Sequence, residues 1–466
     1  MSWFADCMRD QHDFTNAERP EVLAQARLLV GRTLRQLYGE DVEVPKGKGA
    51  FGQLVEWLHF GYPPNSLKEA DFPVANLELK ATGAVSSRKG WRAKERLVLS
   101  NINYLDLAQE EQFETSTFYV KNGQLLLVVY FWVAEKSPLE YRILGVGVIE
   151  IAGMNPVDRQ IIRDDWTKIR QAVLDGRAHE LSEGDTSYLK AARKGAGTGQ
   201  DDRRQPFSSV AAPNRAFSFR QSFVTRLIEP LIDGSKKLRE DEQALVHDEV
   251  ELETKTFDDL VLERFEPFLG RTVEGIASEL DPNLNRTAKG FYADVARRML
   301  GVSTRRIEEF EKADIIMKTV RIQSRRKRPR ESMAFPAFRY RDLAKQTWLD
   351  SDLRDALSKR FLFVFFVDDG ESYRLSHAAF WAMPETTLEG EVRPVWEETQ
   401  RRIKSGRADD LPTSGESRVA HVRPHARDAA DTDITPDGSH VVKKCFWLNA
   451  AFIGKIFEET ARTNQP

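Results

Sequence analysis

An internal repeat constrains this 466-residue chain more than any other feature. Segments of the first half return in the same order, at similar offsets, in the second half. The matched segments are Leu29–Thr33 with Leu269–Val273, Lys48–Val55 with Lys289–Ala296, Ala75–Lys80 with Ala313–Lys318, Leu125–Trp132 with Phe361–Val367, and Ala216–Phe223 with Cys445–Phe452. Ordered self-similarity of this kind indicates one structural unit used twice. The sequence therefore predicts a duplicated fold.

Length and composition agree with two domains, because 466 residues exceed what one core usually holds. We expect domains at residues 1–232 and 257–466, joined by a charged connector at 233–256. No apolar stretch reaches the roughly 18 residues of a membrane helix, and the first residues do not resemble a signal peptide. Two cysteines cannot form a disulfide framework or a conventional zinc site. We expect a cytoplasmic protein with no membrane partner.

Hydrophobic spacing predicts helices and strands mixed along each half, and therefore an α/β (α+β) fold with a mixed sheet. A helix is expected over Glu21–Leu37 and a second one after Gly49. The expected strands, placed in one sheet, are Val74–Ala81, Leu97–Asn101, Gln124–Ala134 and Tyr141–Ile151. Ala216–Leu231 is expected to be a strand that turns into a helix.

Acidic and basic side chains gather around the first of these strands. Residues two apart on a strand face the same side, so Glu78 and Lys80 point together, and Asp71 precedes them closely. Glu56, on the second helix, could complete the group. Carboxylate oxygens suit Mg²⁺, which can polarise a phosphate during hydrolysis. The pattern alone is loose, and an exposed ion pair on a strand would look the same.

Comparison of the two halves favours the catalytic interpretation. The matched positions are Glu56 with Arg297, Asp71 with Glu309, Glu78 with Ile316 and Lys80 with Lys318. A structural ion pair gives no reason for Glu56 and Glu78 both to lose their carboxylates in the second copy, whereas loss of a metal site does. We therefore expect one metal site, in the first half.

Several motifs now carry a family resemblance. They are Lys48-Gly-x-x-Gly-Gln-Leu-x-Glu-Trp57, Asp71-Phe72, Leu77-Glu-Leu-Lys80, Asp158-Arg-Gln160 with Asp165-Trp166, and Gly184-Asp-x-x-Tyr-Leu189. Together they resemble the MutH mismatch-repair endonucleases over most of residues 20–230. The duplicated architecture is similar to two-domain type II restriction endonucleases of the Sau-three-AI type, which cut at GATC.

The resemblance implies a restriction-endonuclease-like (MutH-like) fold, present twice. It implies that Glu56, Asp71 and Glu78 bind Mg²⁺ and that Lys80 assists the attacking water. A second family lysine precedes the next core strand, and Lys121 matches it best. The first half would cut double-stranded DNA at a GATC-like site. The second half would bind DNA as an effector, which leaves open a second copy of the site and self-association on DNA.

Basic residues supply candidate DNA contacts. Lys46 and Lys48 flank glycines beside the active-site helix, where the backbone can approach a phosphate. A family loop with Arg-Pro reads the site, and the matching positions are Arg423 and Pro424 in the second half and Arg193 and Lys194 in the first. Arginine suits bidentate contacts with guanine, although any one of these residues could instead be an ordinary surface charge.

Two other functions stay open at this point. One is a mismatch-repair nicking endonuclease that acts on hemimethylated DNA, against which the duplication argues. The other is a non-catalytic, sequence-specific DNA-binding protein, against which the intact set of residues argues, namely Glu56, Asp71, Glu78 and Lys80.

Overall fold

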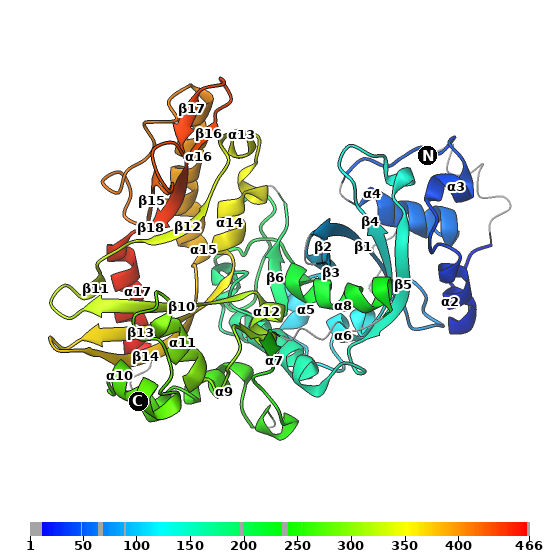
Figure 1. Cartoon of the computed structure of the whole chain (residues 1–466). Helices are drawn as coiled ribbons and strands as arrows, with labels where there is room; N and C mark the ends of the chain where they lie inside the picture. Colours follow the sequence, from blue (N-terminus) through cyan, green and yellow to red (C-terminus); the bar gives the residue numbers. More distant parts are fainter. Residues whose placement is uncertain are drawn as a thin grey trace. The chain divides into compact units, whose positions relative to one another are not determined.

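The computed structural model describes residues 12–47, 49–63, 69–87, 90–195, 199–234, 241–252 and 254–463 (Figure 1). The chain forms two compact units. The first consists of Met1–His179, Ser187–Glu240 and Glu311–Ala313, and the second of Glu180–Thr186, Asp241–Phe310 and Asp314–Pro466. Each unit has its own sheets and helices, and the expected mixed α/β architecture is confirmed.

The first unit contains a mixed four-stranded sheet with the order β2-β1-β4-β5 (Figure 1). Its strands are β1 (Glu78–Ser87), β2 (Gly90–Ala93), β4 (Gln124–Phe131) and β5 (Ile143–Glu150). β1 runs parallel to β4, while β2 and β5 pair antiparallel on the outside. The apolar residues of β4 are buried on both faces, as expected of a central strand.

A separate three-stranded sheet has the order β3-β7-β6, formed by β3 (Leu97–Asn101), β6 (Leu189–Arg193) and β7 (Arg215–Phe219). The helices along this part of the chain are α2 (Arg19–Arg27), α3 (Leu34–Tyr38), α4 (Ala50–Leu54), η2 (Val55–His59), α5 (Tyr104–Leu107), α6 (Thr117–Asn122), η3 (Pro138–Glu140), α7 (Pro156–Leu174), η4 (Ala178–Glu180) and α8 (Gln221–Asp233). The expectation that β3 joins the catalytic sheet is therefore wrong, because alternation along a strand does not identify its partner.

Two expected element bounds are also corrected. The predicted helix over Glu21–Leu37 is two short helices, because Gly31 lies between α2 and α3 with a φ of 82°, which a helix cannot contain. The predicted strand from Val74 begins only at Glu78, because Phe72 and Leu77 pair with each other across a tight turn.

The core of the first unit positions the catalytic strand. Leu79 of β1 and Leu126 and Val128 of β4 pack in one cluster with Phe51 and Leu54 of α4. Because successive strand residues point to opposite faces, burial of Leu79 in this core turns its two neighbours in β1 toward the other face.

The second unit also has a mixed four-stranded sheet, with the order β11-β10-β13-β14 (Figure 1). Its strands are β10 (Ile315–Gln323), β11 (Arg328–Pro329), β13 (Arg360–Asp368) and β14 (Tyr373–Ala382). A three-stranded sheet follows the order β12-β18-β15, with β12 (Met333–Ala337), β15 (Ala420–Pro424) and β18 (Lys444–Leu448). Short strands are β8 (Glu242–Gln243), β9 (Arg306–Ile307), β16 (Thr432–Ile434) and β17 (His440–Val442).

The helices along the second part of the chain vary widely in length. They are η5 (Glu249–Leu252), α9 (Phe257–Glu263), η6 (Glu266–Phe268), α10 (Val273–Leu280), α11 (Phe291–Met299), α12 (Glu308–Ala313), α13 (Tyr340–Leu343), η7 (Trp348–Asp350), α14 (Asp352–Leu357), α15 (Glu385–Thr387), η8 (Leu388–Val392), α16 (Arg393–Lys404) and α17 (Ala450–Thr463). Phe361, Phe363 and Phe365 of β13 pack in the core of the second unit.

The strand registers of the two units follow the sequence repeat. In the first unit Glu78 of β1 lies opposite Leu125 of β4, in a parallel pair. In the second unit Ile316 of β10 lies opposite Phe361 of β13, also in a parallel pair. The same residues are matched to each other by the repeat, so residue-by-residue comparison of the two sheets is justified.

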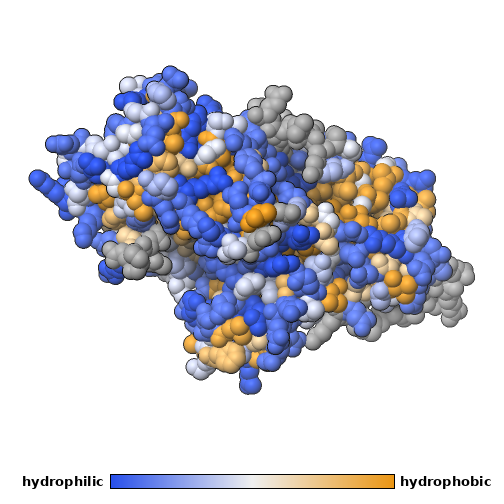
Figure 2. Space-filling model, turned by 90° about the horizontal axis from the view of Figure 1, so that it is seen from below, coloured by the Kyte–Doolittle hydropathy of each residue, from blue (hydrophilic) through white to orange (hydrophobic). Residues whose placement is uncertain are grey.

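Polar and apolar residues are interspersed on the molecular face in Figure 2. Within the described ranges, no helix is long and apolar enough to cross a membrane.

One buried carboxylate joins two of the motifs seen in the sequence. Asp165 of α7 is buried and accepts hydrogen bonds from the backbone N–H groups of Ser187 at 2.6 Å, Tyr188 at 2.6 Å and Leu189 at 2.9 Å. These bonds fix the start of β6. A buried carboxylate that satisfies several backbone donors is expensive to remove, since each donor would then lack an acceptor.

We therefore expect Asp165→Asn to lower the free energy of unfolding by about 2–3 kcal/mol, because the amide replaces one acceptor oxygen by a donor. Urea unfolding followed by circular dichroism measures this loss. The control is Asp175→Asn at an exposed carboxylate after α7, which we expect to unfold at nearly the same urea concentration as the unsubstituted chain. Equal effects of the two variants would contradict the anchoring role.

Candidate active site

A tight turn brings Asp71 back beside the first residues of β1. The backbone N–H of Asp71 donates to Oε2 of Glu78 at 3.2 Å, and Oδ2 of Asp71 accepts from the N–H of Leu79 at 2.9 Å. Asn76 adopts a φ of 51° within this turn. The two carboxylates are therefore held close together by backbone geometry, as the sequence predicts.

Two lysines approach the same carboxylate. Nζ of Lys80 lies 2.6 Å from Oε1 of Glu78, and Nζ of Lys121 lies 3.7 Å from the same oxygen. The Glu78 side chain is only 3% exposed. Lys121 comes from the last turn of α6, directly before β4, and the parallel register of β1 with β4 explains why it reaches Glu78. The structure thus brings together both lysines expected from the sequence.

Glu56 joins the group from η2, a π-helical turn that continues α4. Burial, and then the charges of Asp71 and Glu78, raise the pKa of Glu56 to about 7, against the opposing effect of Lys80 and Lys121. π-Helical turns are rare and often occur at functional sites. Matched α11 in the second unit is a regular α-helix at Arg297.

The pKa of Asp71 is also raised, first by burial and then by the negative charge of Glu78. Lys80 and the N–H of Leu79 act in the opposite direction. Raised carboxylate pKa values in a charged cluster are typical of functional sites, because folding alone gives no reason to crowd like charges.

One member of this cluster, Tyr62, was not predicted from the sequence. Tyr62 is 3% exposed, and its hydroxyl has no hydrogen-bond partner among the described residues. Burial raises the pKa of its phenol strongly, and the carboxylates of Asp71, Glu56 and Glu78 raise it further. A single tyrosine after a helix forms no pattern, so no signal in one sequence would have identified it.

The donor set fits a hard divalent cation in its chemistry. Glu56, Asp71 and Glu78 supply carboxylate oxygens, the ligands that such cations prefer, and an ion between them would relieve the repulsion that helps to raise the pKa values of Glu56 and Asp71. The described part of the chain contains no group of three or more His, Cys, Asp or Glu side chains that is arranged to hold a metal ion. Mg²⁺ is usually held by one or two carboxylates and several waters, so a pair of these carboxylates is enough to bind it.

The matched positions of the second unit have different partners. Arg297 pairs with Asp294 on its own helix, and the Glu309 carboxylate accepts hydrogen bonds from the N–H groups of Leu245 and Val246. Lys318 is half-buried, and burial lowers its pKa. Arg297, Glu309 and Lys318 therefore make the contacts of ordinary structural residues and do not resemble the ligands of a metal centre.

The candidate DNA contacts fall in several places. Lys46 is exposed in the loop before α4, and Lys48 lies outside the described residues. Arg193 ends β6, and Nζ of the next residue, Lys194, donates to Asn101 at 2.6 Å. Arg423 and Pro424 are exposed at the end of β15.

The two arginines differ in strand register. Arg193 lies opposite Arg215 of β7, whereas Arg423 lies opposite Cys445 of β18, which the repeat matches to Ala216. Adjacent strand positions face opposite sides of a sheet. The two halves therefore do not present these arginines in the same way.

Comparisons with known proteins agree with this site. A family model described as DNA mismatch repair enzyme MutH matches residues 60–165. The DNA mismatch repair protein MutH of Vibrio parahaemolyticus serotype O3:K6 is 25% identical over 232 residues, which cover 48% of this chain and 92% of that protein. The first half of the chain is therefore similar in sequence to the MutH endonucleases.

A second relative covers nearly the whole chain. The type II restriction enzyme Sau3AI of Staphylococcus aureus is 30% identical over 495 residues, which cover 93% of this chain and 97% of that protein. The chain belongs to this family: it is a type II restriction endonuclease and therefore a DNA-binding hydrolase.

The pKa of Glu56 predicts how the stability of the metal-free chain depends on pH. Its folded-state pKa of about 7 lies above the 4.5 of a freely exposed glutamate, so this group contributes stability that is present below about pH 4.5 and lost as pH rises through about 7. In EDTA, we expect Glu56→Gln to raise the free energy of unfolding by about 1–2 kcal/mol at pH 8 and by much less at pH 5, after allowance for partial solvent screening.

Urea unfolding at both pH values measures this effect. The control is Glu43→Gln, at an exposed glutamate outside the cluster, which we expect to behave like the unsubstituted chain at both pH values. A Glu56→Gln chain that is no more stable at pH 8 would argue against a crowded acidic site.

Proposed function

We propose that this chain is a Mg²⁺-dependent restriction endonuclease that cuts double-stranded DNA at a specific site, GATC, with its first half. The second half, with the same topology and without carboxylates at the positions of Glu56 and Glu78, binds DNA and regulates cutting. Both halves would then carry a MutH-like fold, with domains at 1–232 and 257–466 around the connector at 233–256. Glu78 and Ile316 occupy matching registers in parallel strand pairs, so the same sheet position holds a carboxylate in the first half and an apolar side chain in the second. This difference is the observation on which the proposal rests.

Within the first half, Glu56, Asp71 and Glu78 would hold the Mg²⁺. The ion would polarise the phosphate to be cut, which is the chemistry that the protein side chains cannot supply alone. Lys80, held against Glu78 at 2.6 Å, would orient the attacking water and offset the negative charge that develops on the phosphate. Lys121, on the other side of the same carboxylate, would add a second positive charge.

The second half would read DNA with Arg423. Its guanidinium lies 3.9 Å from the centre of the Trp447 ring, and this stacking limits the orientations that the exposed side chain adopts. A pre-oriented guanidinium suits bidentate contact with a guanine in the major groove. Arg193, Lys194, Lys46 and Lys48 would contact DNA in the first half.

One active site in each chain cuts one strand. A double-strand break therefore requires two chains on the DNA or two successive cuts by one chain. We propose that chains associate on DNA, where a second copy of the site bound by the second half brings them together. The enzyme would act in the cytoplasm, where it meets its DNA.

The direct test is digestion of a mapped plasmid in Mg²⁺, followed by sequencing of the ends. Ends at GATC support the proposed site, and cutting elsewhere contradicts it. Unmethylated, hemimethylated and fully methylated substrates separate restriction from mismatch-repair nicking. A chain that nicks only hemimethylated DNA would overturn the restriction role.

Matched lysines test the assignment of chemistry to the first half. We expect Lys80→Ala to reduce single-turnover cleavage by about 10³-fold, because it removes the charge beside the reacting phosphate. Lys318→Ala changes the equivalent lysine of β10, and we expect it to cut within about threefold of the unsubstituted enzyme. Asp71→Ala should also abolish cutting and retain DNA binding. Equal losses for both lysine variants would contradict a single active site.

Arg423→Ala should weaken binding to GATC-containing DNA by about 10-fold and relax discrimination against other sequences, as expected for loss of a base contact. The rate of the cutting step should stay the same when it is measured with enough enzyme to bind all of the DNA. The control is Arg427→Ala, which changes a nearby exposed arginine paired with Asp428. If the two variants bind alike, Arg423 has no recognition role.

A further inference from the structure

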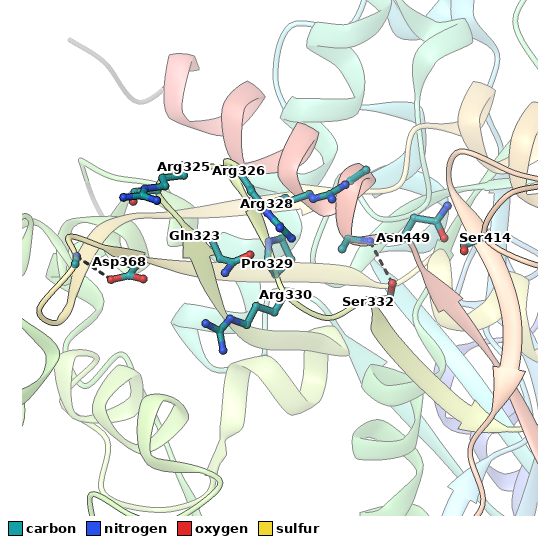
Figure 3. Close-up of a pocket in the computed structure, with 14 residues that line it drawn as sticks. Gln323, Arg325, Arg326, Arg328, Pro329, Arg330, Ser332, Asp368, Ser414 and Asn449 are labelled. Atoms are coloured by element: carbon teal, nitrogen blue, oxygen red, sulfur yellow. Dashed lines mark hydrogen bonds between the residues drawn. The ribbon is translucent and has the colours of Figure 1, made fainter.

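A strongly basic hollow of about 910 Å³ lies beside the turn that joins β10 to β11 in the second unit. Four arginines from this one stretch line it: Arg325, Arg326, Arg328 and Arg330. Figure 3 shows their side chains spreading from the turn and from the segment after it, with Ser332 and Asn449 at the other side. None of these arginines belongs to the candidate sites described above.

The four guanidinium groups have no acidic partner within the described ranges of the chain. Other arginines of the second unit, such as Arg393 and Arg402, pair with glutamates. Asp368 also lines the hollow, but its Oδ1 accepts from the backbone N–H of Gly370 at 2.9 Å. Positive charges gathered without counter-charges repel one another, and a bound anion would relieve this repulsion.

Packing against α17 fixes the turn in place. A Cβ added at Gly454 would lie 2.7 Å from the carbonyl oxygen of Lys327 and 2.8 Å from Cβ of Arg328, so the turn rests directly on the helix where only glycine fits. Lys327 itself has a φ of 50°, and its Nζ lies 3.7 Å from Glu458 of the same helix. The arginines therefore extend from a rigid base.

The far side of the hollow is the start of α17. Ser332 Oγ accepts from the backbone N–H of Ala450 at 3.2 Å, which joins the segment after β11 to the first turn of this helix (Figure 3). The positive end of the 14-residue helix adds to the field of the arginines. Both features favour a ligand with negative charge.

The composition of the lining narrows the class of anion. Among the described residues that line the hollow none is aromatic, so it offers no surface on which a base could stack. Its volume exceeds that of one phosphate group, and arginines spread along a turn can contact successive phosphates. A phosphodiester backbone fits this arrangement better than a nucleotide does.

We propose that this hollow grips the sugar-phosphate backbone of DNA and acts as a sequence-independent clamp of the second half. The inference rests on the proposed function, in which the second half binds DNA, and adds the surface that supplies affinity. Arg423 would contribute selectivity and the clamp would contribute strength, which is the usual division between base and phosphate contacts.

The test uses the full chain in EDTA, so that DNA is bound without being cut. Binding of a fluorescent GATC-containing duplex and of a scrambled duplex is measured by anisotropy at several salt concentrations. We expect the double variant Arg325→Ala/Arg326→Ala to bind both duplexes about 10-fold more weakly near 0.1 M salt. The slope of log K against log salt should fall by about 1–2, as for loss of two phosphate contacts.

The control is Arg401→Ala/Arg427→Ala, which removes the same charge from exposed arginines paired with Glu398 and Asp428. Equal binding and slopes for the two double variants would overturn the clamp, as would a loss confined to the GATC duplex. Calorimetry with inorganic phosphate tests whether the hollow binds a small free anion. Phosphate binding lost only in the Arg325→Ala/Arg326→Ala variant, with DNA binding unchanged, would make the hollow a small-anion site and also overturn the clamp.

Failure of the clamp and failure of the proposed function give different results. If the unsubstituted chain binds neither duplex and cuts no plasmid, the proposed function is wrong. If it binds and cuts while the two double variants behave alike, only the clamp is wrong.

Discussion

The parallel pairing of β1 with β4 is the constraint on which the candidate site depends. Parallel strands begin at the same edge of a sheet, so the register that sets Glu78 opposite Leu125 also brings the end of α6 to that edge. Lys121 thereby reaches a carboxylate that lies far away in sequence. The turn before β1 adds Asp71, and burial of Leu79 in the core directs Glu78 and Lys80 away from it. A shift of one residue in this register would turn Glu78 and Lys80 to the opposite face of the sheet and separate the residues of the site.

The second unit keeps the parallel pairing and lacks the acidic cluster. Ile316 stands where the first unit has Glu78, and the carboxylate of Glu309 serves instead to bind backbone N–H groups of Leu245 and Val246. Lys318 keeps its place in β10. In our proposal, loss of the carboxylates matched to Glu56 and Glu78 removed the means to hold a cation and left a unit suited to binding anions. Binding and chemistry would then be divided between two copies of one topology.

Much of this arrangement could be predicted from the sequence, and the exceptions have physical causes. Strand periodicity identified Leu97–Asn101 correctly, but it could not assign that strand to a separate sheet, because partners lie far along the chain. The helix expected over Glu21–Leu37 failed at Gly31, where a left-handed backbone intervenes. Lys121 was proposed through family resemblance, and the structure places its Nζ 3.7 Å from Glu78. Tyr62 was missed because only the fold buries its hydroxyl among carboxylates.

The central claim is that the chain holds its catalytic cation in the first half alone. Iron-directed cleavage of the protein tests it most directly: Fe²⁺ replaces Mg²⁺, ascorbate and peroxide generate radicals at the ion, and mass spectrometry maps the backbone cuts. We predict cuts near residues 56 and 71–80 that excess Mg²⁺ suppresses. Cuts of equal strength near residues 309–318, or a pattern that Mg²⁺ does not change, would contradict the account.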